Sequence, residues 1–191
     1  EHRGERVFRF EYLGKHYWLK QPEQLKGIWL LLKPYPKQHF KEECEILQHL
    51  NNIGAPVPKL CGFGDDYLVL EDAGPTLNIW LNDETLSWAE KSHILHSAIE
   101  ILINLHQKGI IHGRPAIRDI AWKEGKITFM DFESHSKSHN EHWLITRDML
   151  AFLDSLCRVK SLDDEKLNEL FDYYKSHCPI TYWDDMLSYV R

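Results

Sequence analysis

The segment 110–133, IIHGRPAIRDIAWKEGKITFMDFE, gathers residues of this chain whose types and spacing could do chemistry. Asp119 lies in a tight loop, and Asp131 directly follows the apolar stretch ITFM and precedes an aromatic residue. A carboxylate at the end of an apolar strand needs a partner, because an unpaired buried charge is costly. Magnesium prefers carboxylate and phosphate oxygens, so Asp119 and Asp131 could bind a nucleotide-associated metal ion. The simpler alternative is that Asp119 caps a turn and Asp131 ends a strand.

Two further side chains stand at the beginning of this loop, His112 and Arg114. Arg114 cannot act as a general base, because a guanidinium group has no acceptor and does not lose its proton. It could clamp a phosphate of a substrate or nucleotide, or it could pair with Asp119 or Asp131 and block the site. Arg118 leaves the same two possibilities open. We expect His112 to support the backbone of the loop rather than to transfer protons.

The order of these residues resembles the catalytic loop and metal-binding strand end of the protein-kinase-like superfamily, H-x-D-x-x-x-x-N followed by D-F-G. His112 takes the His position and Asp131 the metal-binding Asp position. Asp119 replaces the Asn, and the catalytic Asp position falls on Arg114. The resemblance implies a catalytic site made of these four residues, with the two Asp side chains as magnesium ligands.

Within this superfamily the chain is similar to small atypical bacterial kinases. These are the lipopolysaccharide core sugar kinases and the RIO-like kinase of the tRNA threonylcarbamoylation complex. The motifs NIGAPVP, IIHG and TFMDFE carry the similarity, which extends over residues 7–155. It implies transfer of the γ-phosphate of ATP with magnesium, although both groups normally keep the Asp that Arg114 replaces here.

The resemblance also implies a nucleotide-binding set in the first half of the chain. Lys20 ends the stretch YWLK and is expected to hold the α- and β-phosphates, oriented by a Glu of the following helix. We prefer Glu43 for this ion pair because ECEIL followed by NIGAPVP resembles the pattern of the small atypical kinases, but Glu42 and Glu45 compete with it. Glu71 opens the expected hinge and is assigned to the nucleotide site.

Several other features of the resemblance concern the loops. No G-x-G-x-x-G precedes the first strands, so we expect the phosphate-covering loop to be short, absent or upstream of Glu1. Glu133 replaces the Gly that usually follows Asp-Phe, which removes free backbone dihedral angles there. Asp148 matches the structural Asp that hydrogen-bonds the catalytic-loop backbone. The segment between Glu133 and the helix of Asp148 is short and lacks A-P-E, which favours a sugar, glycolipid or other small-molecule acceptor over a peptide.

Three functions follow as hypotheses from these features. The preferred one is an atypical ATP- and magnesium-dependent phosphotransferase, because both acidic positions are retained. The second is a nucleotide-binding pseudokinase or regulatory scaffold, because Arg114 stands at the position of the base. The third is a partner-binding module without nucleotide.

Composition excludes some other classes of protein. The formal net charge of −6 argues against a nucleic-acid binder, and no apolar run approaches the roughly 20 residues that span a bilayer. We therefore expect a cytoplasmic protein without a transmembrane segment or signal peptide, with peripheral membrane contact left open. The four scattered cysteines indicate neither a zinc site nor a disulfide framework. His135, His139 and His142 cluster in a polar loop, for which a solvated loop is the preferred interpretation over a metal site.

The order of predicted strands and helices indicates an α+β protein, and the resemblance implies a two-lobed protein-kinase-like fold. A small strand-rich N-terminal lobe is expected over 1–70, a hinge over 71–75 and a helical C-terminal lobe over 76–191. The first lobe should contain a hairpin turning at Gly14, a helix ended by Gly54 and two strands around Gly-Asp-Asp. The second should contain a short helix LNIWL, a long helix ending at Gly109, a strand ITFM, helices over 146–158 and 163–177, and a terminal segment 182–190.

Overall fold

The computed structural model describes residues 6–22, 36–132 and 140–190. The chain divides into two compact units, Glu1–Ala73 and Gly74–Arg191, which we call the N-terminal unit and the C-terminal unit. The division falls inside the segment 71–75 that the sequence indicates as a hinge. Within the described part of the chain, no helix combines the length and the apolar character needed to cross a membrane.

The N-terminal unit is built on a four-stranded antiparallel sheet with the strand order β1-β2-β4-β3. Its strands are β1 (Val7–Tyr12), β2 (Lys15–Lys20), β3 (Leu60–Gly64) and β4 (Tyr67–Glu71). The expected turn at Gly14 is confirmed. Leu13 and Gly14 both have a positive φ, 51° and 73°, which is the requirement of the two-residue turn that matches the twist of a hairpin.

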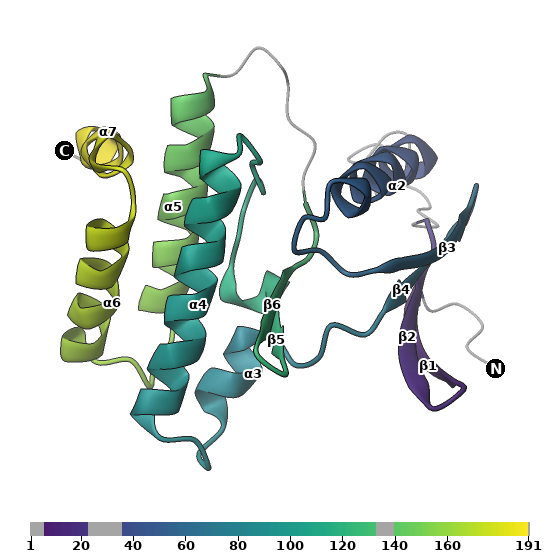
Figure 1. Cartoon of the computed structure of the whole chain (residues 1–191), viewed down its shortest axis with the longest axis horizontal. Helices are drawn as coiled ribbons and strands as arrows, with labels where there is room; N and C mark the ends of the chain where they lie inside the picture. The colour runs from purple at the N-terminus through teal and green to yellow at the C-terminus, as the bar shows by residue number, and fades with distance from the viewer. Residues whose placement is uncertain (1–5, 23–35, 133–139, 191) are drawn as a thin grey trace, which may run out of the picture. The chain divides into compact units, whose positions relative to one another are not determined.

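Helix α2 (Pro36–Asn52) packs against this sheet (Figure 1). Its apolar side buries Phe40, Cys44, Leu47 and Leu50, which recur at helical spacing. The connection to β3 is fixed by Asn51, whose amide donates to the carbonyl oxygens of Leu47 and Pro58 at 2.9 and 3.2 Å, and accepts from the Leu60 N–H at 3.1 Å. The NIGAPVP motif therefore forms a pinned loop between α2 and the sheet.

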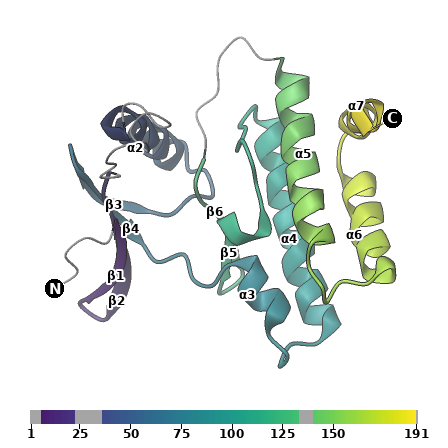
Figure 2. The same ribbon diagram turned by 180° about the vertical axis from the view of Figure 1, so that it is seen from behind.

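The C-terminal unit is mainly helical. The central helix α4 (Trp88–Gln107) starts with a reciprocal capping box between Ser87 and Glu90, and Gly109 follows its end with φ 70°. Helix α5 (Glu141–Cys157) runs beside α4 (Figures 1 and 2). Helix α6 (Asp164–His177) packs against α4, and α7 (Ile180–Val190) packs against α5. The expected start of α5 at Thr146 is wrong, because Asn140 caps the helix by accepting from the His142 N–H.

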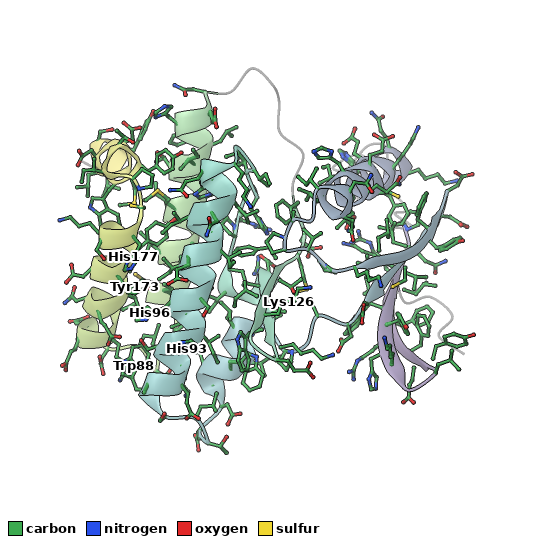
Figure 3. All side chains as sticks on the ribbon, viewed as in Figure 1. Trp88, His93, His96, Lys126, Tyr173 and His177 are labelled. Carbon is green, nitrogen blue, oxygen red and sulfur yellow. The ribbon has the colours of Figure 1, made fainter. Side chains whose placement is uncertain are left out.

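A ring stack joins α4 to α6. The Tyr173 ring of α6 stacks on His96 of α4, with centroids 3.7 Å apart, and on His177 one turn further along α6, at 3.9 Å (Figure 3). The Tyr173 hydroxyl also donates to Glu100, and this hydrogen bond raises the pKa of Tyr173 to about 12. The stack and its hydrogen bond fix the position of α6 against the central helix.

A small hairpin of β5 (Ile120–Lys123) and β6 (Lys126–Phe129) carries the two acidic candidates. Only β6 was expected from the sequence, since the IAWK stretch of β5 is short and closely follows the loop. Thr76, just before α3 (Leu77–Asn82), bridges Ala121 of β5, and the Trp122 N–H donates to the Pro75 carbonyl at 3.0 Å. Gly74 has φ 88°, and a Cβ there would lie 2.8 Å from the Lys123 Cβ, so this approach requires glycine.

Candidate active site

Asp148 of α5 holds the loop that contains His112. Its side chain is fully buried and accepts from two successive backbone N–H groups, those of His112 at 2.8 Å and Gly113 at 2.9 Å. The Nε2 atom of His106 on α4 lies 3.3 Å from the same carboxylate. These contacts confirm the expected structural role of Asp148. The buried carboxylate of Asp148 provides acceptors for two backbone N–H groups of the loop.

The buried ring of His112 joins the loop to the strand end. Its Nε2 donates to the Met130 carbonyl at 2.8 Å, and its Nδ1 faces the Arg114 N–H at 3.4 Å. These partners assign the neutral tautomer with the proton on Nε2. Phe132 packs on the ring, with centroids 4.5 Å apart. These two contacts connect the loop to the strand end, and the expectation that His112 supports the loop rather than transfers protons stays a prediction.

Asp119 and Asp131 are brought together by the β5–β6 hairpin. Asp119 ends a single turn of 3-10 helix, η1 (Ile117–Asp119), and its carbonyl accepts from the N–H of Met130 at 2.8 Å. Asp131, the next residue, has φ 59° and is exposed, so the expectation of a buried charge at the strand end is wrong. A non-glycine residue in this left-handed region costs on the order of 1 kcal/mol and is common at functional sites. Packing of apolar side chains alone would not favour this backbone conformation at Asp131.

The two carboxylates interact electrostatically. Burial raises the pKa of Asp119 above its ordinary value, Arg118 lowers it, Asp131 raises it and Arg114 lowers it. The Arg118 guanidinium lies 3.7 Å from the Asp119 carboxylate, and both arginine residues are exposed. The half-buried Asp119 carboxylate therefore lies in the field of a second carboxylate and of two guanidinium groups, which act on its pKa in opposite directions. All four groups belong to the C-terminal unit.

In the N-terminal unit, Lys20 of β2 forms an ion pair with Glu43 of α2. Both side chains are largely buried, with 15% and 20% of their surfaces exposed. The competing residues have other partners: Glu42 accepts from Gln38, and Glu45 lies near Lys41. The structure therefore selects Glu43 among the three expected candidates. The part that this pair would play toward phosphates remains a prediction.

The hinge residue Glu71 ends β4, where its N–H donates to the Lys59 carbonyl at 2.9 Å. The next residue, Asp72, was not foreseen as important. Its carboxylate accepts from Trp18 Nε1 at 2.6 Å and from Arg9 at 3.2 Å, which fixes the end of β4 to the hairpin. The only sequence signal for it was its place beside Glu71.

The remaining histidine and loop predictions concern a segment that is mostly not described. Glu133, His135 and His139 lie outside the described residues. The third histidine of the expected cluster, His142, is in the first turn of α5, and its Nδ1 lies 2.6 Å from Asp185 of α7. His142 thus connects two helices.

Comparison with known proteins gives the family. A RIO domain model matches residues 33–166, which include α2, the catalytic-loop candidates and the start of α6. An uncharacterized protein of Haemophilus influenzae is 48% identical over all 191 residues, and the chain covers 79% of the length of that protein. The resemblance inferred from NIGAPVP, IIHG and TFMDFE is therefore correct at the level of the superfamily. The chain belongs to the RIO domain family, a branch of the protein-kinase-like superfamily.

Proposed function

We propose that this protein is an atypical ATP- and magnesium-dependent phosphotransferase whose acceptor is a sugar, a glycolipid or another small molecule. The observation that carries the proposal is the pair of interacting carboxylates, Asp119 and Asp131. The loop before Asp119 is held by Asp148, which accepts from two of its backbone N–H groups. Membership of a kinase-like family supports nucleotide binding in general. The Lys20–Glu43 pair of the N-terminal unit is the type of ion pair that holds phosphates in kinase-like proteins.

The side chains of the acidic pair fit a magnesium ion. Both offer carboxylate oxygens, the ligand type that magnesium prefers. Burial and Asp131 raise the pKa of Asp119, while Arg118 and Arg114 lower it. A magnesium ion bound there would neutralise charge on the phosphates. We propose that Asp119 and Asp131 bind the magnesium ion, and that Lys20, oriented by Glu43, binds the α- and β-phosphates of ATP.

The reaction forms a bond between an acceptor hydroxyl oxygen and the γ-phosphorus of ATP. The bond from that phosphorus to the β,γ-bridging oxygen breaks, ADP leaves, and the hydroxyl proton passes to water because Arg114 cannot accept it. Loss of a general base costs typically about 10² to 10⁴ in rate, or roughly 3 to 5.5 kcal/mol. Phosphoryl transfer depends mainly on positioning and charge neutralisation, so we expect slow turnover rather than none.

The acceptor class follows from the segment after Asp131. Helix α5 begins at Glu141, earlier than the sequence indicated, and so leaves even less chain for a peptide-docking activation segment. A small acceptor is consistent with this limit. The segment between Asp131 and α5 is shorter than the activation segment along which protein kinases bind peptides.

A nucleotide-binding pseudokinase is the second candidate, favoured by the cation at the base position and by the Arg118–Asp119 contact. The change Arg114→Asp separates the two. A loss of ATP turnover in this variant would show that the natural chain is an enzyme in which Arg114 takes part in an altered mechanism. A large gain in turnover would instead identify the natural chain as a degenerate enzyme with a restorable base.

Nucleotide binding itself is tested by thermal unfolding. Mg-ATP at a hundredfold over its dissociation constant should stabilise the fold by about 2.7 kcal/mol, a rise in Tm of roughly 5 to 10 °C for a chain of this size. Lys20→Met should remove most of this rise. The matched control Lys15→Met, at the exposed start of the same strand, should keep it. No shift at millimolar nucleotide, with or without magnesium, would leave only a partner-binding module.

A further inference from the structure

The C-terminal unit contains a cavity of about 730 Å³ beside the catalytic-loop candidates. It is open to solvent on one side, and its lining comes from the loop of Arg114 with η1, from α3, and from the C-terminal end of α5 with the residues that follow it. A volume of this size suits a small organic ligand. Nothing in the sequence had indicated it, because its walls come from three separate segments.

The charged lining of this cavity is strongly biased. Its lining includes four cations, Arg114, Arg118, Arg158 and Lys160, and one carboxylate, Asp154, which pairs with Arg158. This excess of positive charge runs against the net charge of the whole chain, −6. Clustered cations around a concave surface concentrate anions there. Solubility alone does not require an acidic protein to group its cations around one cavity.

The fixed groups of the cavity give it a shape suited to an oxyanion. Asp154 holds the Arg158 guanidinium through two contacts, 2.8 Å to Nε and 3.2 Å to Nη2, which limits the directions that its remaining donors can take. The Ile117 N–H donates to the Ser155 hydroxyl at 3.2 Å, so η1 is tied to α5. The amides of Asn78 and Asn82 also line the cavity. Amides of this kind can bind hydroxyl groups.

Arg114 connects the cavity to the acidic pair. It lines the cavity together with Arg118, whose guanidinium lies 3.7 Å from the Asp119 carboxylate, and the charges of both arginines lower the pKa of Asp119. A ligand in the cavity would therefore lie next to the carboxylates proposed to act on the nucleotide. This adjacency distinguishes the cavity from a remote anion site.

We propose that this cavity binds the acceptor of the phosphoryl transfer, and that the acceptor is a hydroxylated small molecule carrying an oxyanion group, a phosphate or a carboxylate. Arg114, Arg118, Arg158 and Lys160 bind the oxyanion, and the acceptor hydroxyl lies on the Arg114 side. The acceptor role rests on the proposed function, whereas binding of the anion does not.

Calorimetric titration without nucleotide or magnesium tests the inference. Ribose 5-phosphate and gluconate represent the two oxyanions, and ribose is the neutral control. We expect at least one anion to bind more tightly than ribose, and the tighter of the two identifies the oxyanion. Lys160→Gln and Arg158→Gln should each weaken that binding about tenfold, the loss of a charge-assisted hydrogen bond. Lys175→Gln, an exposed change on α6, should leave it unchanged.

The variant Asp131→Asn separates this inference from the proposed function, because its side chain is outside the cavity lining. It should lose the effect of magnesium on ATP and still bind the anion. Anion binding without any ATP effect in the unmodified protein would refute the proposed function alone. Failure of both anions to bind better than ribose, or equal affinities for the unmodified protein and the two cation variants, would overturn the cavity assignment.

Discussion

Replacing Asp148 by Ala should destabilise the protein more than any single exposed charge change. The substitution leaves two buried backbone donors, those of His112 and Gly113, without their acceptors. Each unsatisfied buried donor costs about 1 to 3 kcal/mol, and the His106 contact is lost as well. We therefore expect a loss of about 4 kcal/mol in the free energy of unfolding. This is a large share of the roughly 5 to 15 kcal/mol that holds a typical domain folded.

The assay is urea unfolding at neutral pH, combined with thermal unfolding. A cost of that size lowers the Tm by roughly 8 to 16 °C for a chain of this length. Amide hydrogen exchange adds a local readout, because the N–H groups of His112 and Gly113 should exchange much faster in Asp148→Ala. Asp148→Asn should fall between the two proteins, since its amide keeps one acceptor oxygen.

The control is Asp154→Ala on the same helix. Asp154 is exposed and pairs with Arg158 one turn along the helix, so the change should cost less than about 1 kcal/mol. Equal costs for Asp148→Ala and Asp154→Ala, or unchanged exchange at His112 and Gly113, would refute the view that Asp148 holds the catalytic loop.

Three further predictions concern charge. Asp119→Asn should raise the Tm of the nucleotide-free protein, because a carboxylate whose pKa is raised in the folded state destabilises that state at neutral pH; a lower Tm would contradict this. Glu43→Gln should weaken Mg-ATP binding in the same direction as Lys20→Met, measured by calorimetry, because Lys20 then loses its orienting partner; unchanged affinity would separate the ion pair from nucleotide binding. Burial lowers the pKa of His96 below 6.5, so the unfolded chain binds a proton at His96 at a higher pH than the folded protein does, and stability is lost as pH falls below about 6.5. His96→Gln should reduce that loss in unfolding curves measured between pH 7 and 5. An identical dependence of stability on pH in the two proteins would contradict this.

Most of the local fold could be predicted because it depends on local signals. The hairpin at Gly14 requires a residue tolerant of positive φ, and the buried face of α2 follows helical spacing. The start of α5 was missed because Asn140 caps it within a stretch whose composition resembles a loop. Strand β5 was missed because four residues give little periodicity, and pairing with β6 rather than propensity forms it.

The site was predictable where a motif fixes the residue and not where packing decides. Asp119, Asp131 and Asp148 follow from the resemblance to the kinase-like catalytic loop, and the structure adds the hydrogen bonds of Asp148 and the effect of Asp131 on the pKa of Asp119. The choice of Glu43 over its neighbours needed the geometry of α2 against β2. The cationic cavity could not be found from the sequence, because Arg114 and Lys160 are brought to the same surface only by the packing of α5 against η1.

The central claim is that the acidic pair supports phosphoryl transfer from ATP, and ATP turnover tests it most directly. Purified protein with magnesium should convert ATP to ADP slowly, and Asp131→Asn should abolish this conversion while remaining folded. The control Asp172→Asn, an exposed Asp on α6, should keep the full rate. Turnover in Asp131→Asn equal to that of the unmodified protein, or no turnover in a protein that binds Mg-ATP, would contradict the assignment of a phosphotransferase.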